Sequence, residues 1–204
     1  KLSPNNKWVV YSETWYNNYL YRLADKQKQE LTSPPEVGEL VSWTPGGNKL
    51  FYYRSSFDTQ GANKVLSVFG GPSVEFGKQI YDPGWLHFWA PDSKSFLTLG
   101  QSEDGSKRVF WIVPLDGEAP RELSGPDVDA PQSLSPDGSK LLYYKKTEGS
   151  LTGDLLVAPV SLKTNGLSGP SVEIFKNGVN ITPRLHHWSL DGSKIVLSDK
   201  GDIW

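Results

Sequence analysis

Short apolar runs, each about the length of one β-strand, recur along the whole chain and are separated by turn-forming residues. Apolar runs of about four to eight residues bounded by turn signals predict strands. No segment keeps the i, i+3, i+4, i+7 apolar spacing of an amphipathic helix, and Pro or Gly, which disfavour helix interiors, recur at short intervals. No apolar run approaches the roughly 18 residues of a membrane-spanning helix. The pattern therefore predicts an all-β chain that does not insert into a membrane.

One motif occurs five times, in segments 2–11, 43–53, 89–99, 134–144 and 188–197. Each copy has a Trp or Leu, a small residue, usually a Pro, a turn pair such as Asp-Gly, and then Lys before an apolar run. The third positions of the copies are residues 4, 45, 91, 136 and 190, so the spacings are 41, 46, 45 and 54 residues. Periods of this size are typical of repeat architectures.

Each repeat contains signals for four short strands. The turn in the motif joins a strand that ends at the Trp or Leu to an apolar second strand that follows the Lys. We expect a third strand in segments 19–23, 64–69, 108–114 and 154–160. Hairpin signals leading to a polar fourth strand lie at 24–26, 71–75, 116–117 and 169–173. Four antiparallel strands per repeat predict the blade of a β-propeller. A two-sheet sandwich also has many short strands, but it does not predict one motif recurring five times.

The amino-acid composition excludes several kinds of functional site and partner, and it says less about the fold. The 204 residues include 21 Lys and Arg, 23 Asp and Glu, and no Cys. The absence of Cys excludes disulfide scaffolds, Cys-ligated zinc, thiol nucleophiles and iron–sulfur clusters. The balanced and scattered charge gives no basis for a nucleic-acid partner, which needs clustered Lys and Arg. The 20 Gly and 15 Pro fit a chain with many turns.

The five copies resemble the TolB-type propeller repeat, a WD-repeat-like unit with the signature W-S-P-D-G-[SK]-K. Segments 135–140 and 189–194 carry the resemblance most clearly, and 110–124 is similar to the third and fourth strands of that repeat. The resemblance covers essentially the whole chain and implies one propeller region over 1–204. Its units are expected near 2–42, 43–88, 89–133, 134–187 and 188–204. We expect about four and a half to five blades of a larger propeller, incomplete at both ends.

The resemblance implies three functions. The first is a non-catalytic scaffold that binds protein or peptide, similar to the TolB-like propellers, with a periplasmic or extracellular location. The second is a regulatory, substrate-gating propeller of a prolyl-oligopeptidase-like or tricorn-like serine peptidase. The third is a metal-dependent, oligogalacturonate-lyase-like enzyme. We expect no catalytic residues in this chain, because segments 71–75 and 169–173 begin like a nucleophile elbow but end in Glu. We predict no cofactor apart from the divalent metal of the third function, because the sequence has no phosphate-binding Gly-rich motif and no EF-hand pattern.

Three candidate metal ligands come from an alignment of the innermost strands. Three of these strands are aligned on their last residues, Trp89, Leu134 and Trp188. The residue two positions earlier is His87, Gln132 and His186, respectively. Positions two apart on a strand face the same side, and neutral imidazoles there could bind a divalent metal. The oligogalacturonate lyases that the chain resembles hold a metal with His and Gln side chains. The alternative is a packed histidine that makes one hydrogen bond among aromatic neighbours.

Exposed aromatic residues are the other candidate binding groups. Trp15 and Tyr16 lie in a loop between predicted strands, and Trp85 follows an Asp-Pro-Gly turn. We expect them to contact protein, peptide or carbohydrate. The alternative to sugar binding is a structural role in packing, which is the more common use of such residues. We expect core positions for Trp111 and for the Trp residues at repeat positions 43, 89 and 188. The loops between second and third strands, 12–18, 55–63 and 145–153, are long and varied, as is typical where a scaffold carries binding specificity.

Overall fold

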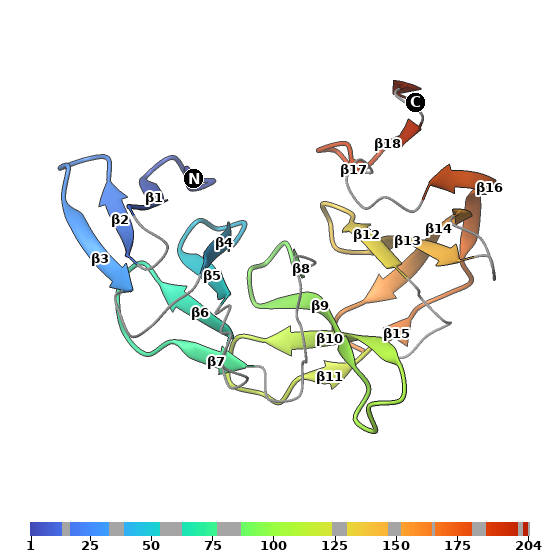
Figure 1. The fold of residues 1–204 in the computed structure, drawn as a ribbon, viewed down its shortest axis with the longest axis horizontal. Helices are drawn as coiled ribbons and strands as arrows, with labels where there is room; N and C mark the ends of the chain where they lie inside the picture. Colours follow the sequence, from blue (N-terminus) through green and yellow to red (C-terminus); the bar gives the residue numbers. More distant parts are fainter. Residues whose placement is uncertain are drawn as a thin grey trace.

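In a computed structural model the chain consists of antiparallel strand units that follow one another around an open arc (Figure 1). The structure describes residues 1–13, 17–32, 39–53, 63–76, 87–123, 130–146, 152–164, 166–180, 187–199 and 202–203. Every regular element in these ranges is a strand. The all-β propeller prediction is confirmed.

The strands fall into five units that match the five motif copies. The first unit contains β1 (Trp8–Ser12), β2 (Asn18–Arg22) and β3 (Lys28–Thr32). The second contains β4 (Glu39–Trp43), β5 (Lys49–Tyr53), β6 (Asn63–Ser67) and β7 (Val74–Phe76). The third contains β8 (His87–Trp89), β9 (Ser95–Gln101), β10 (Arg108–Pro114) and β11 (Arg121–Glu122). The fourth contains β12 (Ala130–Leu134), β13 (Lys140–Lys146), β14 (Thr152–Ser161), β15 (Gly166–Leu167) and β16 (Val172–Asn180). The fifth contains β17 (His187–Trp188), β18 (Ile195–Val196), β19 (Ser198–Asp199) and β20 (Asp202–Ile203).

The pairing within the units follows the predicted meander. The second and third units are four-stranded sheets in chain order, β4-β5-β6-β7 and β8-β9-β10-β11. In the first unit Leu2 bridges Val9, so the start of the chain lies along the inner edge of β1. The fourth unit differs from the prediction, because β14 pairs with both β15 and β16 along one edge. The turn signal predicted at 169–173 therefore lies where β15 connects to β16, and these two strands both pair with β14 and not with each other.

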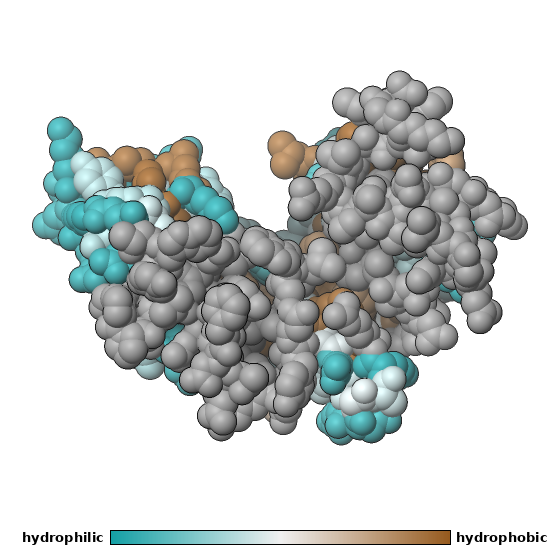
Figure 2. Space-filling model, in the orientation of Figure 1, coloured by the Kyte–Doolittle hydropathy of each residue, from teal (hydrophilic) through white to brown (hydrophobic). Residues whose placement is uncertain are grey.

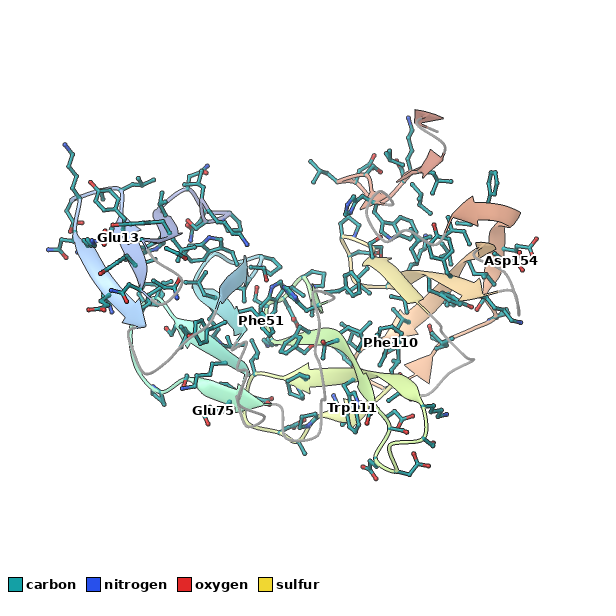
Figure 3. All side chains as sticks on the ribbon, in the orientation of Figure 1. Glu13, Phe51, Glu75, Phe110, Trp111 and Asp154 are labelled. Atoms are coloured by element: carbon teal, nitrogen blue, oxygen red, sulfur yellow. The ribbon has the colours of Figure 1, made fainter. Side chains whose placement is uncertain are left out.

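The hydrophobic core is divided among the junctions between consecutive units. On β9, Phe96 packs toward the second unit while its neighbour Leu97 packs toward the fourth. On β13, Leu141 faces the third unit and Leu142 faces the fifth. Both faces of a central unit are covered, so both sets of alternating side chains are apolar. Figure 3 shows Phe51 at the junction of the second and third units and Phe110 at the next junction.

A hydrogen-bonded turn explains the polar letters of the motif. In the fourth unit Ser135 Oγ donates to the Asp137 carboxylate at 2.6 Å, and Ser139 donates to it through both N and Oγ. The Lys140 backbone N–H donates in return to Ser135 Oγ at 2.9 Å. These hydrogen bonds, led by that from Ser135, lower the pKa of Asp137 to about 2. The same network forms around Asp191, so it closes the first-to-second-strand turn in two units.

A third copy of this turn connects β9 and β10, where the motif alignment did not place one. Ser102 and Ser106 donate to Asp104, and the Lys107 backbone N–H donates to Ser102 Oγ. The hairpin is the hydrophilic projection at the lower edge of Figure 2. Its sequence, Ser-Glu-Asp-Gly-Ser-Lys, has the motif spacing without the Pro. The six-residue sequence is therefore enough to form this hydrogen-bonded turn, and the flanking strands determine which pair of strands the turn connects.

The turns of successive units also touch one another. A methyl group built at Gly138, which has φ +74°, would lie 2.7 Å from Cδ of Pro91 in the preceding unit. Asn5 Nδ2 donates to the carbonyl oxygens of Gly46 and Gly47 at 3.3 and 3.1 Å. The Gly46 backbone N–H donates to Ser93 Oγ at 3.0 Å. The Pro and Gly residues of the motif thus form the turn and also pack against the turn of the neighbouring unit.

Candidate functional site

The structure describes only part of the set of site residues predicted from sequence. Trp15, Tyr16, Trp85 and His186 lie outside the described residues. Gln132 lies in β12, where only its backbone is described. Of the six predicted binding residues only His87 has a described side chain, so the binding roles of the set stay predictions. The expected core positions are confirmed: Trp43 and Trp111 are buried, and Trp89 and Trp188 pack against core clusters.

His87 lies at the inner edge of the second and third units, packed between aromatic rings. Its imidazole stacks on Phe51 with ring centroids 4.5 Å apart. Its Nε2 is hydrogen-bonded to Ser42 Oγ at 2.5 Å, and the indole N–H of Trp89 donates to the same oxygen at 2.8 Å. Burial, together with the positive charge of Lys1, lowers the pKa of His87 to about 4. His87 is thus a neutral, packed histidine that is hydrogen-bonded through Nε2, while its buried Nδ1 has no hydrogen-bond partner among the described residues.

The strand register separates His87 from Gln132. His87 pairs directly with Thr98, without a register shift. Gln132 lies where the register shifts between Pro131 and Ser133, so Pro131 takes the pairing place that His87 has in the third unit. Equal offset from the strand end therefore does not give the same position in the sheet, because the β-bulge adds a residue. Within the described part of the chain no three His, Asp or Glu side chains lie together as a metal site. The metal hypothesis, which also needs His186, stays a prediction.

The hydrogen bond from Trp89 to Ser42 joins the inner strands of the second and third units. The fourth and fifth units have the same pair of residue types in Ser133 and Trp188, but no hydrogen bond joins these two side chains. Ser133 has the same pairing position as Ser42, and Trp188 has that of Trp89. Yet Ser133 Oγ and Trp188 Nε1 are buried without hydrogen-bond partners among the described residues. Buried polar atoms without partners cost free energy. The two junctions thus use the same residue types with different hydrogen bonding.

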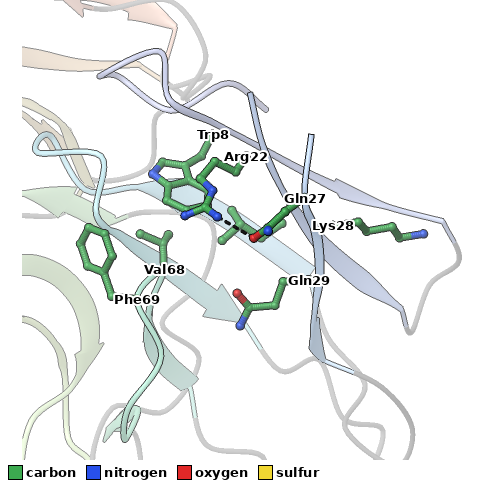
Figure 4. Close-up of a pocket in the computed structure, with 8 residues that line it drawn as sticks. Trp8, Arg22, Gln27, Lys28, Gln29, Val68 and Phe69 are labelled. Carbon is green, nitrogen blue, oxygen red and sulfur yellow. Dashed lines mark hydrogen bonds between the residues drawn. The ribbon is translucent and has the colours of Figure 1, made fainter. Parts of the chain in front are cut away.

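A pocket of about 280 Å³ lies between the first and second units (Figure 4). Leu20 and Val68, both buried, form its apolar floor. Trp8 and Phe69 form its aromatic wall, with ring centroids 6.4 Å apart in an edge-to-face arrangement. Phe69 is 77% exposed, which is unusual for a large apolar side chain. This concave site therefore offers an aromatic surface to a ligand.

Polar side chains of the first unit complete the pocket. The Arg22 guanidinium lies over the Trp8 ring and donates to Asp25 and to Gln27 Oε1. The hydrogen bond to Asp25 raises the pKa of Arg22 and lowers that of Asp25. Gln29 lines the pocket beside Gln27, and its side chain makes no hydrogen bond within the described part of the chain. Lys28 Nζ lies over the Tyr19 ring and is paired with Glu13, so its charge points away from the pocket.

Sequence reasoning missed this pocket. The Trp8 and Leu20 positions were assigned to ordinary strands, and Phe69 was assigned to the end of a third strand. Only the packing of two units brings residues 8, 22, 27–29 and 68–69 together. A weak signal was present, since Phe69 stands immediately before Gly-Gly-Pro, where a turn exposes its neighbours.

Comparisons with known proteins bear on the fold. No protein-family model and no curated protein sequence matches the chain. Among solved structures, TolB from Acinetobacter baumannii matches 96% of the chain with a TM-score of 0.61 and 16% identity. The chain has the β-propeller fold of TolB. A protein from Agrobacterium tumefaciens described as a TolB matches 96% of the chain with a TM-score of 0.64 and 19% identity. The tricorn protease matches 99% of it with a TM-score of 0.64 and 14% identity.

The chain is shorter than these structures. It spans 46% of the Acinetobacter TolB, 67% of the Agrobacterium protein and 24% of the tricorn protease. Identities this low show the fold alone, so peptidase gating stays a prediction. The part of the chain that the structure describes contains no helix long and apolar enough to cross a membrane.

Proposed function

We propose that this TolB-type propeller chain is a non-catalytic scaffold that binds a protein or peptide. The observation that carries the proposal is the pocket between the first and second units, with its exposed Phe69 and its glutamine side chains. Exposed aromatic residues next to hydrogen-bonding groups are typical of interface hot spots. Rigid sheets position such a site without moving parts. A periplasmic or extracellular location belongs to the same proposal and is supported by the likeness to TolB.

Peptide is favoured over carbohydrate by the geometry of Trp8. Sugars stack on open indole faces, but one face of Trp8 lies under the Arg22 guanidinium, 5.6 Å from the ring centroid. Phe69 approaches the same ring edge-to-face. What remains is an apolar recess flanked by side-chain amides, which suits an apolar side chain and the adjoining peptide backbone.

The proposal is tested by probing the purified chain with an array of random 12-residue peptides and, in parallel, with a glycan array. Binding to a subset of peptides, with affinities measured again in solution, is the expected result. Binding to glycans alone, or to neither array, would overturn the proposal.

A further inference from the structure

We infer that the pocket between the first and second units binds a peptide that inserts one large apolar side chain and carries acidic residues beside it. This inference rests on the proposed binding function and adds the class of peptide that the pocket takes. Its volume of about 280 Å³ lies at the lower end of the usual range for ligand pockets. One aromatic or long aliphatic side chain fills such a space, whereas a folded element does not.

The apolar contact would come from the aromatic wall of Trp8 and Phe69 and from the floor of Leu20 and Val68. Phe69 gains most on binding, since 77% of its surface is exposed and a bound side chain would cover it. The floor is already ordered, because Leu20 and Val68 are buried in the core cluster of the first two units. Little side-chain freedom is therefore left to lose there, which favours binding.

The two glutamines supply hydrogen bonds for a peptide backbone. Gln27 uses its Oε1 to accept from Arg22, which orients the side chain and leaves its NH₂ group to donate. Gln29 has both its carbonyl and its NH₂ group available in the described structure. A peptide carbonyl and a peptide N–H can thus both be satisfied at the mouth of the pocket.

The charges around the pocket favour an acidic ligand. Arg22 and Lys28 are already neutralised by Asp25 and Glu13. Lys7 and Lys26 form no ion pair among the described residues. Lys7 precedes Trp8, and its carbonyl accepts a hydrogen bond from Leu23 N, while Lys26 precedes Gln27. On the other side of the balance, Glu30 follows the pocket residue Gln29 and also forms no ion pair among the described residues. Two cations and one anion without ion pairs are thus chain neighbours of pocket residues, and this excess of positive charge favours a ligand that carries carboxylates.

The backbone of Lys26 strengthens this argument. Lys26 has φ +60°, a left-handed conformation that costs free energy for a residue with a side chain. In the third unit the equivalent hairpin position is Gly117: Asp25 accepts from the N–H of Gln27 just as Asp116 accepts from that of Glu118. The first unit thus keeps a strained lysine where glycine fits without strain. Strain of this kind is typical of functional sites.

The experiment measures the affinity of capped tripeptides by titration calorimetry at low and high salt. The probes are acetylated and amidated Glu-Phe-Glu, Lys-Phe-Lys and Glu-Ala-Glu. We expect Glu-Phe-Glu to bind at least tenfold more tightly than either other peptide, with an affinity that falls as salt rises. Equal or tighter binding of Lys-Phe-Lys would overturn the acidic ligand class, and equal binding of Glu-Ala-Glu would overturn the apolar insertion.

Two variants locate the site, and each has a matched control. F69A should weaken Glu-Phe-Glu binding at least tenfold, whereas L190A, at a side chain 97% exposed in the fifth unit, should not. K26G removes a charge and relieves the strained φ, so it should weaken binding three- to tenfold without lowering the melting temperature. K107A removes a charge in the distant β9–β10 hairpin and should leave affinity unchanged.

The outcomes separate this inference from the proposed function. Glu-Phe-Glu binding that is unaffected by F69A and K26G places the peptide site elsewhere, which overturns the inference and leaves the function standing. The same holds if peptides from the random array bind while Glu-Phe-Glu does not. If no peptide of either kind binds, both fail.

Discussion

Contact between the turns of adjacent units can be measured with two glycines that share a sequence context and a backbone conformation. Gly138 and Gly192 have the same place in two turns of sequence Ser-x-Asp-Gly-Ser-Lys, and their φ angles are +74° and +69°. A methyl group at Gly138 would lie 2.7 Å from Cδ of Pro91, whereas one at Gly192 would lie 3.6 Å from Cδ of Pro136. The first distance requires a shift of a proline ring, and the second is ordinary van der Waals contact.

The expected destabilisation follows from these distances. Alanine in the left-handed region costs about 1–2 kcal/mol at either position. Overpacking against Pro91 adds about 1–3 kcal/mol to G138A only. The assay is equilibrium urea unfolding, followed by tryptophan fluorescence and circular dichroism. With a slope of about 2 kcal/mol per M, G138A should unfold roughly 0.5–1.5 M earlier than G192A.

A double-mutant cycle assigns the difference to Pro91. In a P91A background the extra cost of G138A should disappear, leaving the same cost as G192A. Equal midpoints for G138A and G192A, or an unchanged difference without the Pro91 ring, would refute the reasoning. The turns would then be independent of one another, and the core clusters alone would hold adjacent units together.

Three further predictions concern buried and hydrogen-bonded polar groups. S42A should lower the free energy of unfolding by about 1–3 kcal/mol, because it leaves the Trp89 indole and the His87 imidazole without their hydrogen-bond partner. S133A removes a hydroxyl that has no partner among the described residues, so it should be neutral or stabilising in the same urea assay. The pKa of His87 is about 4 in the folded chain and 6.5 when exposed, so the unfolded chain takes up the proton first as pH falls. The contribution of neutral His87 to the free energy of unfolding should therefore be fully present above pH 6.5 and fall by on the order of 3 kcal/mol as pH falls to 4. H87Q should abolish that slope, and a slope that persists in H87Q would contradict the assignment. The pKa of Asp137 near 2, against 3.8 unfolded, adds stability above pH 3.8 that is lost as pH falls to 2, and D137N should remove this loss in acid-unfolding curves.

The repeat made the fold predictable because its signals are local. Trp or Leu at the end of the inner strand, the Asp-Gly turn and the apolar second strand lie within about ten residues of one another, and each specifies its own hairpin. The predicted strand 108–114 and the observed β10 are identical. The fourth unit differs from the prediction because two strands pair with the same edge of β14: β15 pairs with its C-terminal end and β16 with the rest. No local turn signal determines where one pairing ends and the other begins.

The candidate sites were less predictable because they depend on contacts between units. The β-bulge at Gln132 changes the pairing register, and sequence spacing does not reveal a bulge. The pocket combines Trp8 and Gln29 with Phe69, residues that become neighbours only when two units pack. Sequence reasoning could place the histidine of the third unit on an inner strand, but it could not identify Ser42 as its partner.

Photo-crosslinking tests the central claim, that this propeller binds peptide between its first two units, most directly. A Glu-Phe-Glu peptide whose Phe is replaced by benzoylphenylalanine is irradiated with the chain, and mass spectrometry locates the attachment. The account predicts attachment to the pocket wall at Trp8, Gln29 or Phe69, and its suppression by excess unmodified peptide. Attachment confined to other units, or attachment that excess peptide does not suppress, would contradict it.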